Sequence, residues 1–462
     1  MSKRNVILLI VILGVIIIGI FTVFALYQPT STNTGVVGDS INFVANFLPF
    51  GKNKTVAPTD TNTPTDVSGY IPPTESEVSV AKLKKVSSFP VAGFGIFMKE
   101  RFKDVPVITP NTTPVTPTTT DATTTPITKT PTTKDKKQKL PAPVLPPTEF
   151  VPAIRYVNRA TGNIYQTFAD KLDERKFSST VIPKVYEAFF GNKGGSVIMR
   201  YLKADNKTIE TFLGALPKEY LGADSIGTSE VKGSFLPENI TDISISPDTS
   251  KVFYLFNTGD TVAGVTASLQ TSTKVQIFSS PFTEWLSLWP NDKVVTLTTK
   301  PSAYALGFAY STNPNKKDFS KILGGIAGLT TLTSPDGKMV LYGDKNLSLN
   351  ILSLDTRNTY SAGVKTLPEK CVWATTSDVL YCAVPKYIDN GNYPDSWYQG
   401  EVSFSDVIWK IDAKSGNATI VSDPSTDGGE DVDAIKLGLD DNQNYLFFLN
   451  KKDSYLWELS LK

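Results

Sequence analysis

Residues 243–255 read Ile-Ser-Ile-Ser-Pro-Asp-Thr-Ser-Lys-Val-Phe-Tyr-Leu. Apolar residues alternate with serine, Pro-Asp is a turn sequence, and a run of β-forming residues follows. This stretch therefore predicts a strand, a tight turn and a second strand. A second copy, Leu-Thr-Ser-Pro-Asp-Gly-Lys-Met-Val-Leu-Tyr, occupies residues 332–342, and looser copies occupy residues 286–295 and 437–448. A hairpin that recurs every few tens of residues indicates a repeat architecture.

The same alternation of strands and turns continues through the distal part of the chain. From Phe150 to Lys462, short apolar segments alternate with Gly, Asn, Asp and Pro, and helical periodicity is almost absent. The segments group into sets of four strands, and the first set comprises Val86–Gly93, Phe94–Met98, Ile154–Arg159 and Asn163–Phe168. The last set has only three strands. We expect Glu77–Leu83 to supply its fourth strand, because a closed ring leaves no strand edge exposed. The sequence therefore predicts an all-β fold, a β-propeller of seven blades, with six blades as the alternative.

The repeated motif also carries a resemblance. Ser-Pro-Asp-Gly-Lys followed by a β-strand resembles the TolB-type propeller repeat, which is also found in the non-catalytic domains of prolyl-oligopeptidase-like enzymes. Two copies, at residues 246–248 and 334–338, match it well. Residues 154–165, Ile-Arg-Tyr-Val-Asn-Arg-Ala-Thr-Gly-Asn-Ile-Tyr, resemble uncharacterised membrane-anchored propellers of small-genome bacteria. The resemblance implies the fold and a habit of binding proteins or peptides. It implies no chemistry, because a fold does not fix a function.

An apolar run near the N-terminus predicts a membrane anchor. Val6–Tyr27 contains no charged residue and is about 22 residues long, which suffices to cross a bilayer at 1.5 Å per residue. Lys3 and Arg4 precede the run, so the positive-inside rule places the N-terminus in the cytoplasm and the rest of the chain outside. The alternative is a cleaved signal peptide, with a cleavage site at Val23–Ala25. On either interpretation the bulk of the chain is exported.

Composition divides the chain into five parts. Residues 1–28 are the cytoplasmic tip and transmembrane helix, 29–74 a short juxtamembrane helix and flexible tether, 75–105 the N-terminal strands of the propeller, 106–148 a Thr/Pro/Lys-rich insertion, and 149–462 the propeller. The tether and the insertion have few apolar residues to offset the entropy of ordering, so we expect both to be disordered. We expect the insertion to leave the propeller on the same face as the loops that join the blades.

The charge balance and the absence of histidine argue against several classes of function. The 462 residues include 46 Lys and Arg, 45 Asp and Glu, and no His. Balanced charge gives no reason to expect nucleic-acid binding. The absence of histidine removes Ser-His-Asp and Cys-His catalysis and most zinc sites. The sequence also lacks a Gly-x-Ser-x-Gly elbow, a phosphate-binding loop and a dinucleotide fingerprint. These absences favour a protein without catalytic activity, although a carboxylate pair for glycoside cleavage leaves no such signature.

Cys371 and Cys382 are the two cysteines of the chain, and both lie in one predicted hairpin. With Thr376–Ser377 at its tip, the cysteines face each other across two strands, at a separation that a disulfide bridges. Export favours oxidation. The alternative is a pair of small buried apolar side chains.

Two loops of a late blade contain the candidate site residues. The loop Pro385–Val402 is rich in aromatic residues suited to sugars or peptides, and we take Tyr387, Tyr393, Trp397 and Tyr398 as candidate binding residues. The alternative is a loop folded over its own blade, with the aromatic rings as a lid. The joining loop Asp423–Asp433 has enough carboxylates for Ca²⁺, with Asp427, Glu430, Asp431 and Asp433 as candidate ligands. It lacks EF-hand spacing, and the alternative is a solvated connector. We expect no other cofactor.

These features lead to three hypotheses about function. The preferred one is a membrane-anchored, extracytoplasmic β-propeller that binds or scaffolds an envelope protein, peptide or glycan without catalysis. The alternative is a polysaccharide-acting enzyme that uses carboxylates in the propeller funnel. Opposed carboxylates around the axis would favour the enzyme, and an apolar or plugged funnel would count against it. The third is a structural envelope component that assembles through the side of the propeller.

Overall fold

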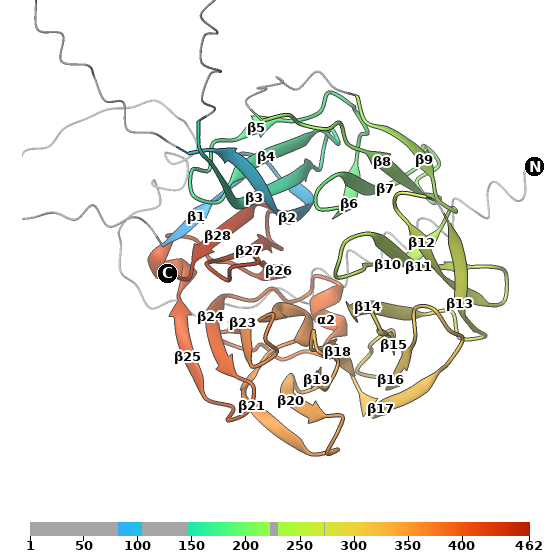
Figure 1. Cartoon of the computed structure of the whole chain (residues 1–462). Coiled ribbons are helices and arrows are strands. Elements are labelled where there is room, and N and C mark those ends of the chain that lie inside the picture. Colours follow the sequence, from blue (N-terminus) through green and yellow to red (C-terminus); the bar gives the residue numbers. More distant parts are fainter. Residues whose placement is uncertain (1–81, 104–145, 222–229, 272) are drawn as a thin grey trace, which may run out of the picture. The chain divides into compact units, whose positions relative to one another are not determined.

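The chain folds around a ring of β-sheets. In a computed structural model, residues 82–103, 146–221, 230–271 and 273–462 are described, and all of them belong to one compact unit, residues 77–462. Their strands form seven four-stranded sheets. Figure 1 shows these sheets as blades that follow one another around a central axis. The predicted seven-bladed, all-β propeller is therefore confirmed, and the six-bladed alternative is wrong.

Six of the blades are continuous in sequence. Blade 1 consists of β2 (Val91–Phe102), β3 (Thr148–Asn158), β4 (Ile164–Phe168) and β5 (Arg175–Lys176), and blade 2 of β6 (Val185–Gly191), β7 (Ser196–Leu202), β8 (Ile209–Ala215) and β9 (Lys232–Phe235). Blade 3 consists of β10 (Ile240–Ile245), β11 (Lys251–Asn257), β12 (Val262–Ser268) and β13 (Lys274–Ser280), and blade 4 of β14 (Trp285–Asn291), β15 (Val294–Thr299), β16 (Leu306–Thr312) and β17 (Ser320–Ala327). Blade 5 consists of β18 (Thr330–Thr333), β19 (Met339–Gly343), β20 (Ser348–Ser353) and β21 (Thr359–Lys365), and blade 6 of β22 (Cys371–Trp373), β23 (Val379–Pro385), β24 (Asp406–Asp412) and β25 (Ala418–Ser422).

Blade 7 combines the two ends of the described chain. Its sheet contains β26 (Ala434–Leu439), β27 (Tyr445–Asn450), β28 (Leu456–Ser460) and β1 (Leu83–Lys85), in that order. In β1, Leu83 is opposite Leu459 and Lys85 is opposite Trp457. The prediction that an early segment closes the ring is confirmed. The described closing strand is Leu83–Lys85, which shares Leu83 with the predicted Glu77–Leu83, and residues 77–81 lie outside the described residues.

Strand direction gives the ring two distinct faces. In each blade the first strand lies nearest the axis and the fourth lies at the rim (Figure 1). Because neighbouring strands are antiparallel, the first-to-second and third-to-fourth connections emerge on one face. We call this the hairpin face, and residues 246–250 are one of its turns. The second-to-third connections and the links between blades, such as residues 423–433, emerge on the opposite face, which we call the linker face.

The Ser-Pro-Asp-Gly turn between β18 and β19 is held by its own side chains. Ser334 Oγ donates to Asp336 Oδ1 (2.6 Å) and accepts from Met339 N (3.0 Å). Gly337 has a φ of 72°, a conformation that glycine adopts without steric cost. The turn at residues 246–251 makes the same two bonds, at 2.6 and 2.9 Å. The aspartate of each motif therefore stabilises the turn.

The prediction for blade 1 wrongly divides its first strand into two. Val86–Gly93 and Phe94–Met98 are not two strands, because the chain continues through β2 from Val91 to Phe102. At the expected boundary, Gly93 allows close packing between blades, since a Cβ on it would lie 2.0 Å from the carbonyl oxygen of Ala188 in blade 2.

This change moves the predicted insertion to the other face. Residues 104–145 connect the first and second strands of blade 1, and Phe102 is paired with Thr148 at the end of the β2–β3 hairpin. The insertion therefore starts and ends on the hairpin face. Our expectation of the linker face is wrong.

Apolar side chains fill the spaces between neighbouring blades. One cluster joins blade 1, through Val157 and Ile164, to blade 2, through Val197 and Met199. Similar clusters join blade 6 to blade 7 and blade 7 to blade 1. Each blade thus relies on both of its neighbours for burial, as expected for a closed ring.

Among the residues that the structure describes, no helix is both long enough and apolar enough to span a membrane. The apolar run Val6–Tyr27, the tether and nearly all of the insertion lie outside the described residues.

Ring closure gives a first testable prediction. Leu83 on β1 is 3% exposed and packs against blades 6 and 7, whereas Ile420 on β25 is 61% exposed. Both residues lie on the outermost strand of a blade. We expect Leu83→Ala to lower the free energy of unfolding by about 2–5 kcal/mol, because it leaves a cavity in the closing joint. Ile420→Ala should change it by less than about 0.5 kcal/mol. Equal melting temperatures for the two variants would contradict a stabilising role of β1.

Candidate functional site

The loop between β23 and β24, residues 386–405, bends inward over the linker face, and we call it the capping loop. It contains α2 (Asp395–Tyr398), which Figure 1 places beside the inner strands of blades 4 to 6. Asp395 Oδ2 accepts a hydrogen bond from Ala303 N of blade 4 at 2.6 Å. Lys451 of blade 7 donates to the carbonyl oxygen of Trp397, and its Nζ lies 4.1 Å from the centre of the Trp397 ring. The capping loop is therefore fixed to blades on both sides of its own.

The four aromatic candidates on this loop differ in exposure. Tyr393 and Trp397 are each 4% exposed and form a cluster with Phe404 beneath the loop. Tyr387 is 81% exposed and Tyr398 is 37% exposed. Tyr393 and Trp397 thus hold the capping loop to the propeller, Tyr387 is accessible to a partner, and Tyr398 is only partly accessible.

A buried cluster of charges lies below the loop. Lys370, from the 3₁₀ turn η2 (Pro368–Lys370), is fully buried. Its Nζ donates to Asp406 Oδ2 (2.7 Å), Asp433 Oδ1 (2.5 Å) and the carbonyl oxygen of Ala434 (3.0 Å). Burial raises the pKa of Asp406 above its ordinary value. Burial alone would also raise the pKa of Asp433, but Lys370 and several hydrogen bonds lower it below its ordinary value. The cluster ties blade 6 to blade 7.

Asp433 also anchors the capping loop. Asp433 Oδ2 accepts hydrogen bonds from Trp397 Nε1 and from Phe404 N, both at 3.0 Å. Ser403 Oγ donates to it at 3.2 Å. The loop conformation and the joint between two blades therefore depend on one carboxylate.

The structure does not bring the four candidate calcium ligands together. Asp427 accepts from Ser422 Oγ (2.6 Å), Glu430 from Lys85 Nζ (2.7 Å) and Asp431 from Ser405 Oγ (2.9 Å), while Asp433 binds Lys370. Within the described ranges, no group of three or more acidic, histidine or cysteine side chains is arranged to hold a metal ion. A short helix, α3 (Pro424–Asp427), capped by Asp423, occupies part of this joining loop.

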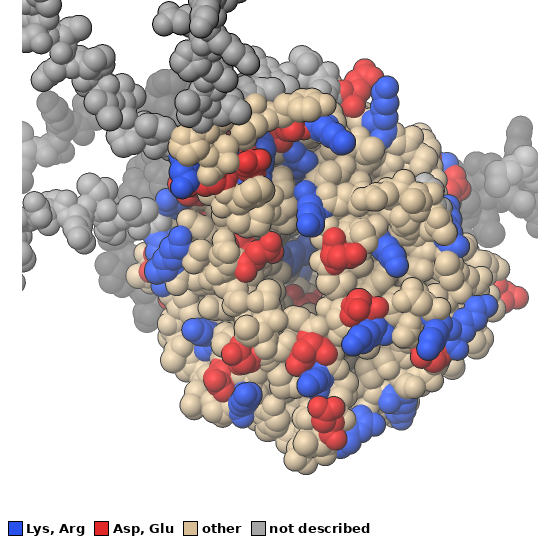
Figure 2. All heavy atoms as spheres, viewed as in Figure 1, with Lys and Arg blue, Asp and Glu red and all other residues tan. Residues whose placement is uncertain are grey.

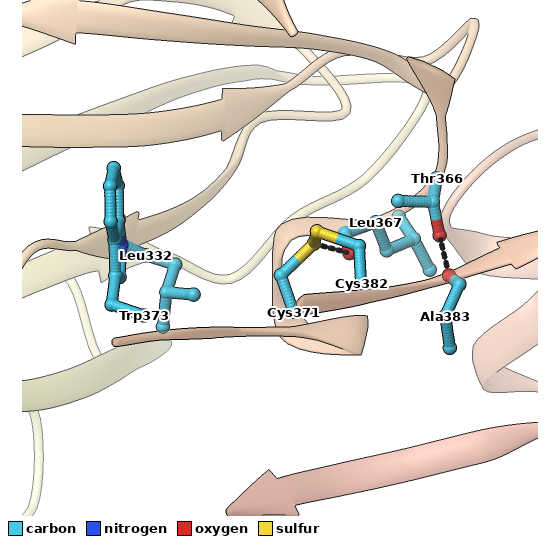
Figure 3. The surroundings of a disulfide bond; sticks show 7 residues. All are labelled: Leu332, Thr366, Leu367, Cys371, Trp373, Cys382 and Ala383. Carbon is cyan, nitrogen blue, oxygen red and sulfur yellow. Dashed lines mark hydrogen bonds between the residues drawn. A yellow bond between two sulfur atoms is a disulfide. The ribbon is translucent and has the colours of Figure 1, made fainter. Parts of the chain in front are cut away.

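The two cysteines lie opposite each other at the start of blade 6. Cys371 in β22 is paired with Cys382 in β23, and a disulfide joins them. Both are buried, and Figure 3 shows the bond close to Leu367, whose carbonyl oxygen lies 3.9 Å from Cys371 Sγ. The disulfide therefore links the innermost strand of blade 6 to its neighbour, one residue after the buried lysine of the charge cluster.

Carboxylates also lie on the inner strands, next to the central channel. Glu187 in blade 2 accepts from Arg200 Nη1 (2.5 Å) and from Lys436 Nζ of blade 7 (2.9 Å). Blade 1 stands between blades 7 and 2 in the ring, so this second ion pair passes along the channel side of blade 1. Asp242 in blade 3 accepts from both the backbone N and the Oγ of Ser287, each at 2.6 Å. Burial raises the pKa of Asp242 to about 6, although these hydrogen bonds oppose the shift.

A small cavity lies between the inner strands of blades 4 and 5 and the capping loop. Ser287, Thr331, Glu369 and Tyr398 are among its lining residues, and its volume is about 50 Å³. Tyr398 donates to Glu369 Oε1 at 2.6 Å. Burial raises the pKa of Glu369 and raises the pKa of Tyr398 well above its ordinary value. Small-molecule sites usually measure about 300–1,000 Å³, so this cavity has room for a few water molecules and not for a sugar ring.

Sequence reasoning missed Lys370, Asp406, Asp242 and Glu369. Asp242 could have been identified from the sequence, because an aspartate inside the strand Ile240–Ile245 is unfavourable unless its side chain has a partner. No local sequence pattern points to Lys370, since its two carboxylate partners are 36 and 63 positions away in the chain.

Figure 2 shows acidic and basic side chains interspersed over the face in view, with a hollow near its centre that contains charged side chains. Neither sign of charge forms a continuous patch on this face. The view thus agrees with the balanced composition.

No protein-family model matches the chain, and no curated protein matches it. Among solved structures, it is similar to oligogalacturonate lyase from Vibrio parahaemolyticus, with 10% identity, a TM-score of 0.44, and coverage of 67% of this chain and 86% of that chain. It is also similar to TolB from Acinetobacter baumannii, with 11% identity, a TM-score of 0.35, and coverage of 65% and 60%. A chain of a mitotic checkpoint complex matches with 12% identity, a TM-score of 0.42, and coverage of 67% and 86%. At these values the matches decide nothing about activity.

The buried charge cluster generates a stability prediction. Lys370→Met leaves Asp406 and Asp433 buried without a counter-ion, and we expect the free energy of unfolding to fall by about 3–5 kcal/mol. Lys386→Met, which breaks a partly exposed ion pair with Asp423, should cost less than about 1 kcal/mol. Denaturant unfolding followed by tryptophan fluorescence measures both. Similar midpoints for the two variants would show that the cluster contributes little.

The disulfide gives a second prediction for this region. Reduction should lower the stability of the native chain by about 2–4 kcal/mol, because the unfolded chain gains conformational freedom. The Cys371→Ala/Cys382→Ala variant should melt at the same temperature with and without reductant. Titration of the unfolded, unreduced chain should find no free thiol. Two titratable thiols would contradict the disulfide.

Proposed function

We propose that this chain is a membrane-anchored, extracytoplasmic β-propeller that binds an envelope protein, peptide or glycan on its linker face, without catalysis. The membrane anchor and the location rest on the sequence, through Val6–Tyr27 and the basic residues that precede it. The binding function rests on the accessible aromatic side chains of the linker face.

The observation that carries the binding proposal is the exposure of these aromatic residues. Phe282 (72% exposed) lies in the link from blade 3 to blade 4, and Tyr304 (78%) lies in the second-to-third connection of blade 4. Tyr387 (81%) and Tyr398 (37%) belong to the capping loop. Ala303, next to Tyr304, bonds directly to the capping loop. Aromatic rings on a fixed loop provide contact area at a low cost in conformational entropy.

The alternative function is a polysaccharide-acting enzyme in the propeller funnel. Asp242, with its raised pKa, is the carboxyl that favours it, since a general acid must stay protonated near the working pH. Two observations support the non-catalytic proposal instead. The cavity beside Glu369 is only about 50 Å³, and the capping loop is fixed over it by Tyr398. The carboxylates of Glu187 and Asp242 are already engaged by groups of the protein.

A capture experiment tests the proposal. The purified full chain is used as bait with native envelope extract, beside a Tyr304→Ala/Tyr387→Ala variant and a Phe150→Ala variant. Phe150 is 65% exposed but lies on β3 near the hairpin face, so its removal is the matched control. We expect the double variant to recover at least about ten-fold less partner, given that each exposed aromatic anchor contributes about 1–2 kcal/mol. Equal recovery by all three chains would contradict binding on the linker face. Glycan cleavage that is lost in Asp242→Asn would favour the enzyme.

A further inference from the structure

A second cavity lies on the hairpin face, away from the capping loop. Its volume is about 700 Å³, within the range of small-molecule sites. Three segments form its walls. They are the projecting end of β2 (residues 99–102), the turn from β4 to β5 (residues 166–175) and the connection that follows β8 (residues 219–221). The cavity is therefore shared by the hairpin-face ends of blades 1 and 2.

Glu219 lies in the wall of this cavity with three cations around it. Its Oε2 accepts from Lys99 Nζ at 2.5 Å and from Arg155 Nη2 at 2.7 Å, and its Oε1 accepts from Arg175. The Glu219 side chain is 9% exposed, and the three basic side chains are 20%, 6% and 30% exposed. Three positive charges thus share one negative charge in a partly buried site, so the positive charges there outnumber the carboxylate by two.

Packing holds Arg155 in this crowded position. Its guanidinium carbon lies 4.8 Å from the ring centre of Phe97 and 4.0 Å from that of Phe177. Its Nε donates to Gln166 Oε1 at 2.8 Å, and its Nη1 donates to the carbonyl oxygen of Gly194. A charge fixed in this way cannot move into solvent when the neighbouring cations repel it. Burial and the repulsion of Arg175 lower the pKa of Arg155 to about 10, although Glu219 opposes the shift.

The other charges of the cavity do not offset this excess. Arg101 is already paired, through Nε to Glu149 (2.9 Å) and through Nη1 to Asp170 (2.8 Å). Glu100 and Asp173 also line the cavity but are exposed, so solvent screens them. Solvent screens the partly buried cations around Glu219 less. The positive potential of the cavity is therefore strongest beside these cations.

Apolar rings border the charged floor. Phe168 lines the cavity and lies below Lys99 and Arg101, whose charged groups are 5.6 and 5.1 Å from its ring centre. Tyr220 is 74% exposed at the cavity edge. A ligand that enters thus meets cationic nitrogens at the floor and flat aromatic surface at the sides.

We propose that this cavity binds a small anionic ligand through a carboxylate or phosphate group that contacts Lys99 and Arg175 beside Glu219. Arg175 and Lys99 are the more exposed of the three cations and donate hydrogen bonds to the ligand. The more deeply buried Arg155 attracts the anion electrostatically without contacting it. The site lies on the opposite face from the aromatic surface and is independent of the function proposed above. It makes the propeller a two-sided binding protein.

Calorimetric titration of the full chain at low ionic strength tests the proposal. The probes are inorganic phosphate and D-glucuronate, and D-glucose is the uncharged control. We expect saturable binding of at least one anion and none of D-glucose. Phosphate alone or glucuronate alone would each support the site and would identify which oxyanion it prefers.

Variants separate binding from a merely structural ion network. Arg175→Gln and Lys99→Gln should each weaken binding about ten-fold or more, because each removes a charge-assisted hydrogen bond. Arg101→Gln is the matched control, because Arg101 lines the same cavity but has two carboxylates of its own, Glu149 and Asp170, and it should change the affinity less than about three-fold. Glu219→Gln should tighten binding, since the anion no longer competes with an internal carboxylate. A purely structural network predicts no such gain.

Melting temperatures of all variants show which of them retain the fold. The proposal is overturned if neither anion binds saturably to the native chain. It is also overturned if both anions bind Arg175→Gln and Lys99→Gln as tightly as the native chain.

Discussion

A ring of sheets is stable only when it has no gap, and here three residues close it. β1 pairs with β28, so the first described strand completes the last blade. Without it, blade 7 would expose the edge of β28 to other chains. The backbone N of Leu456 also donates to Ser87 Oγ, a side chain 369 positions earlier in the chain. Both faces of the propeller, and therefore every surface discussed above, have fixed positions because this joint is closed.

The interior of the ring is organised by charge as well as by apolar packing. Lys370, Asp406 and Asp433 form a fully buried cluster at the joint between blades 6 and 7, where water is unavailable to solvate them. Asp433 also receives the indole N–H of Trp397. One carboxylate thus contributes both to the joint between two blades and to the position of the capping loop. Tyr387 and Tyr398 of the aromatic surface lie on that loop, so the polar cluster beneath it helps to fix their positions.

Local sequence signals predicted the repeat well and the long-range contacts poorly. The Ser-Pro-Asp turns, the seven sets of strands and the facing cysteines are encoded within a few residues, so periodicity and turn chemistry were sufficient. The break expected at Gly93 was wrong, because glycine there serves close packing against Ala188 and not a turn. That error placed the insertion on the wrong face. The aromatic and acidic loops were located correctly on one face. The roles of Trp397 and Asp433, however, involve Lys370, a partner that no local pattern reveals.

The single disulfide also affects how the chain matures. Two cysteines allow only one pairing within a molecule, and they are 11 positions apart in one hairpin. No incorrect intramolecular bond exists to be reshuffled, so formation of the disulfide requires an oxidant but no isomerase. The hairpin can bring the two thiols together while blade 7 is still unfolded. The competing product is a cross-link between two chains, and crowding of unfolded molecules therefore poses a greater oxidative hazard than mispairing within one.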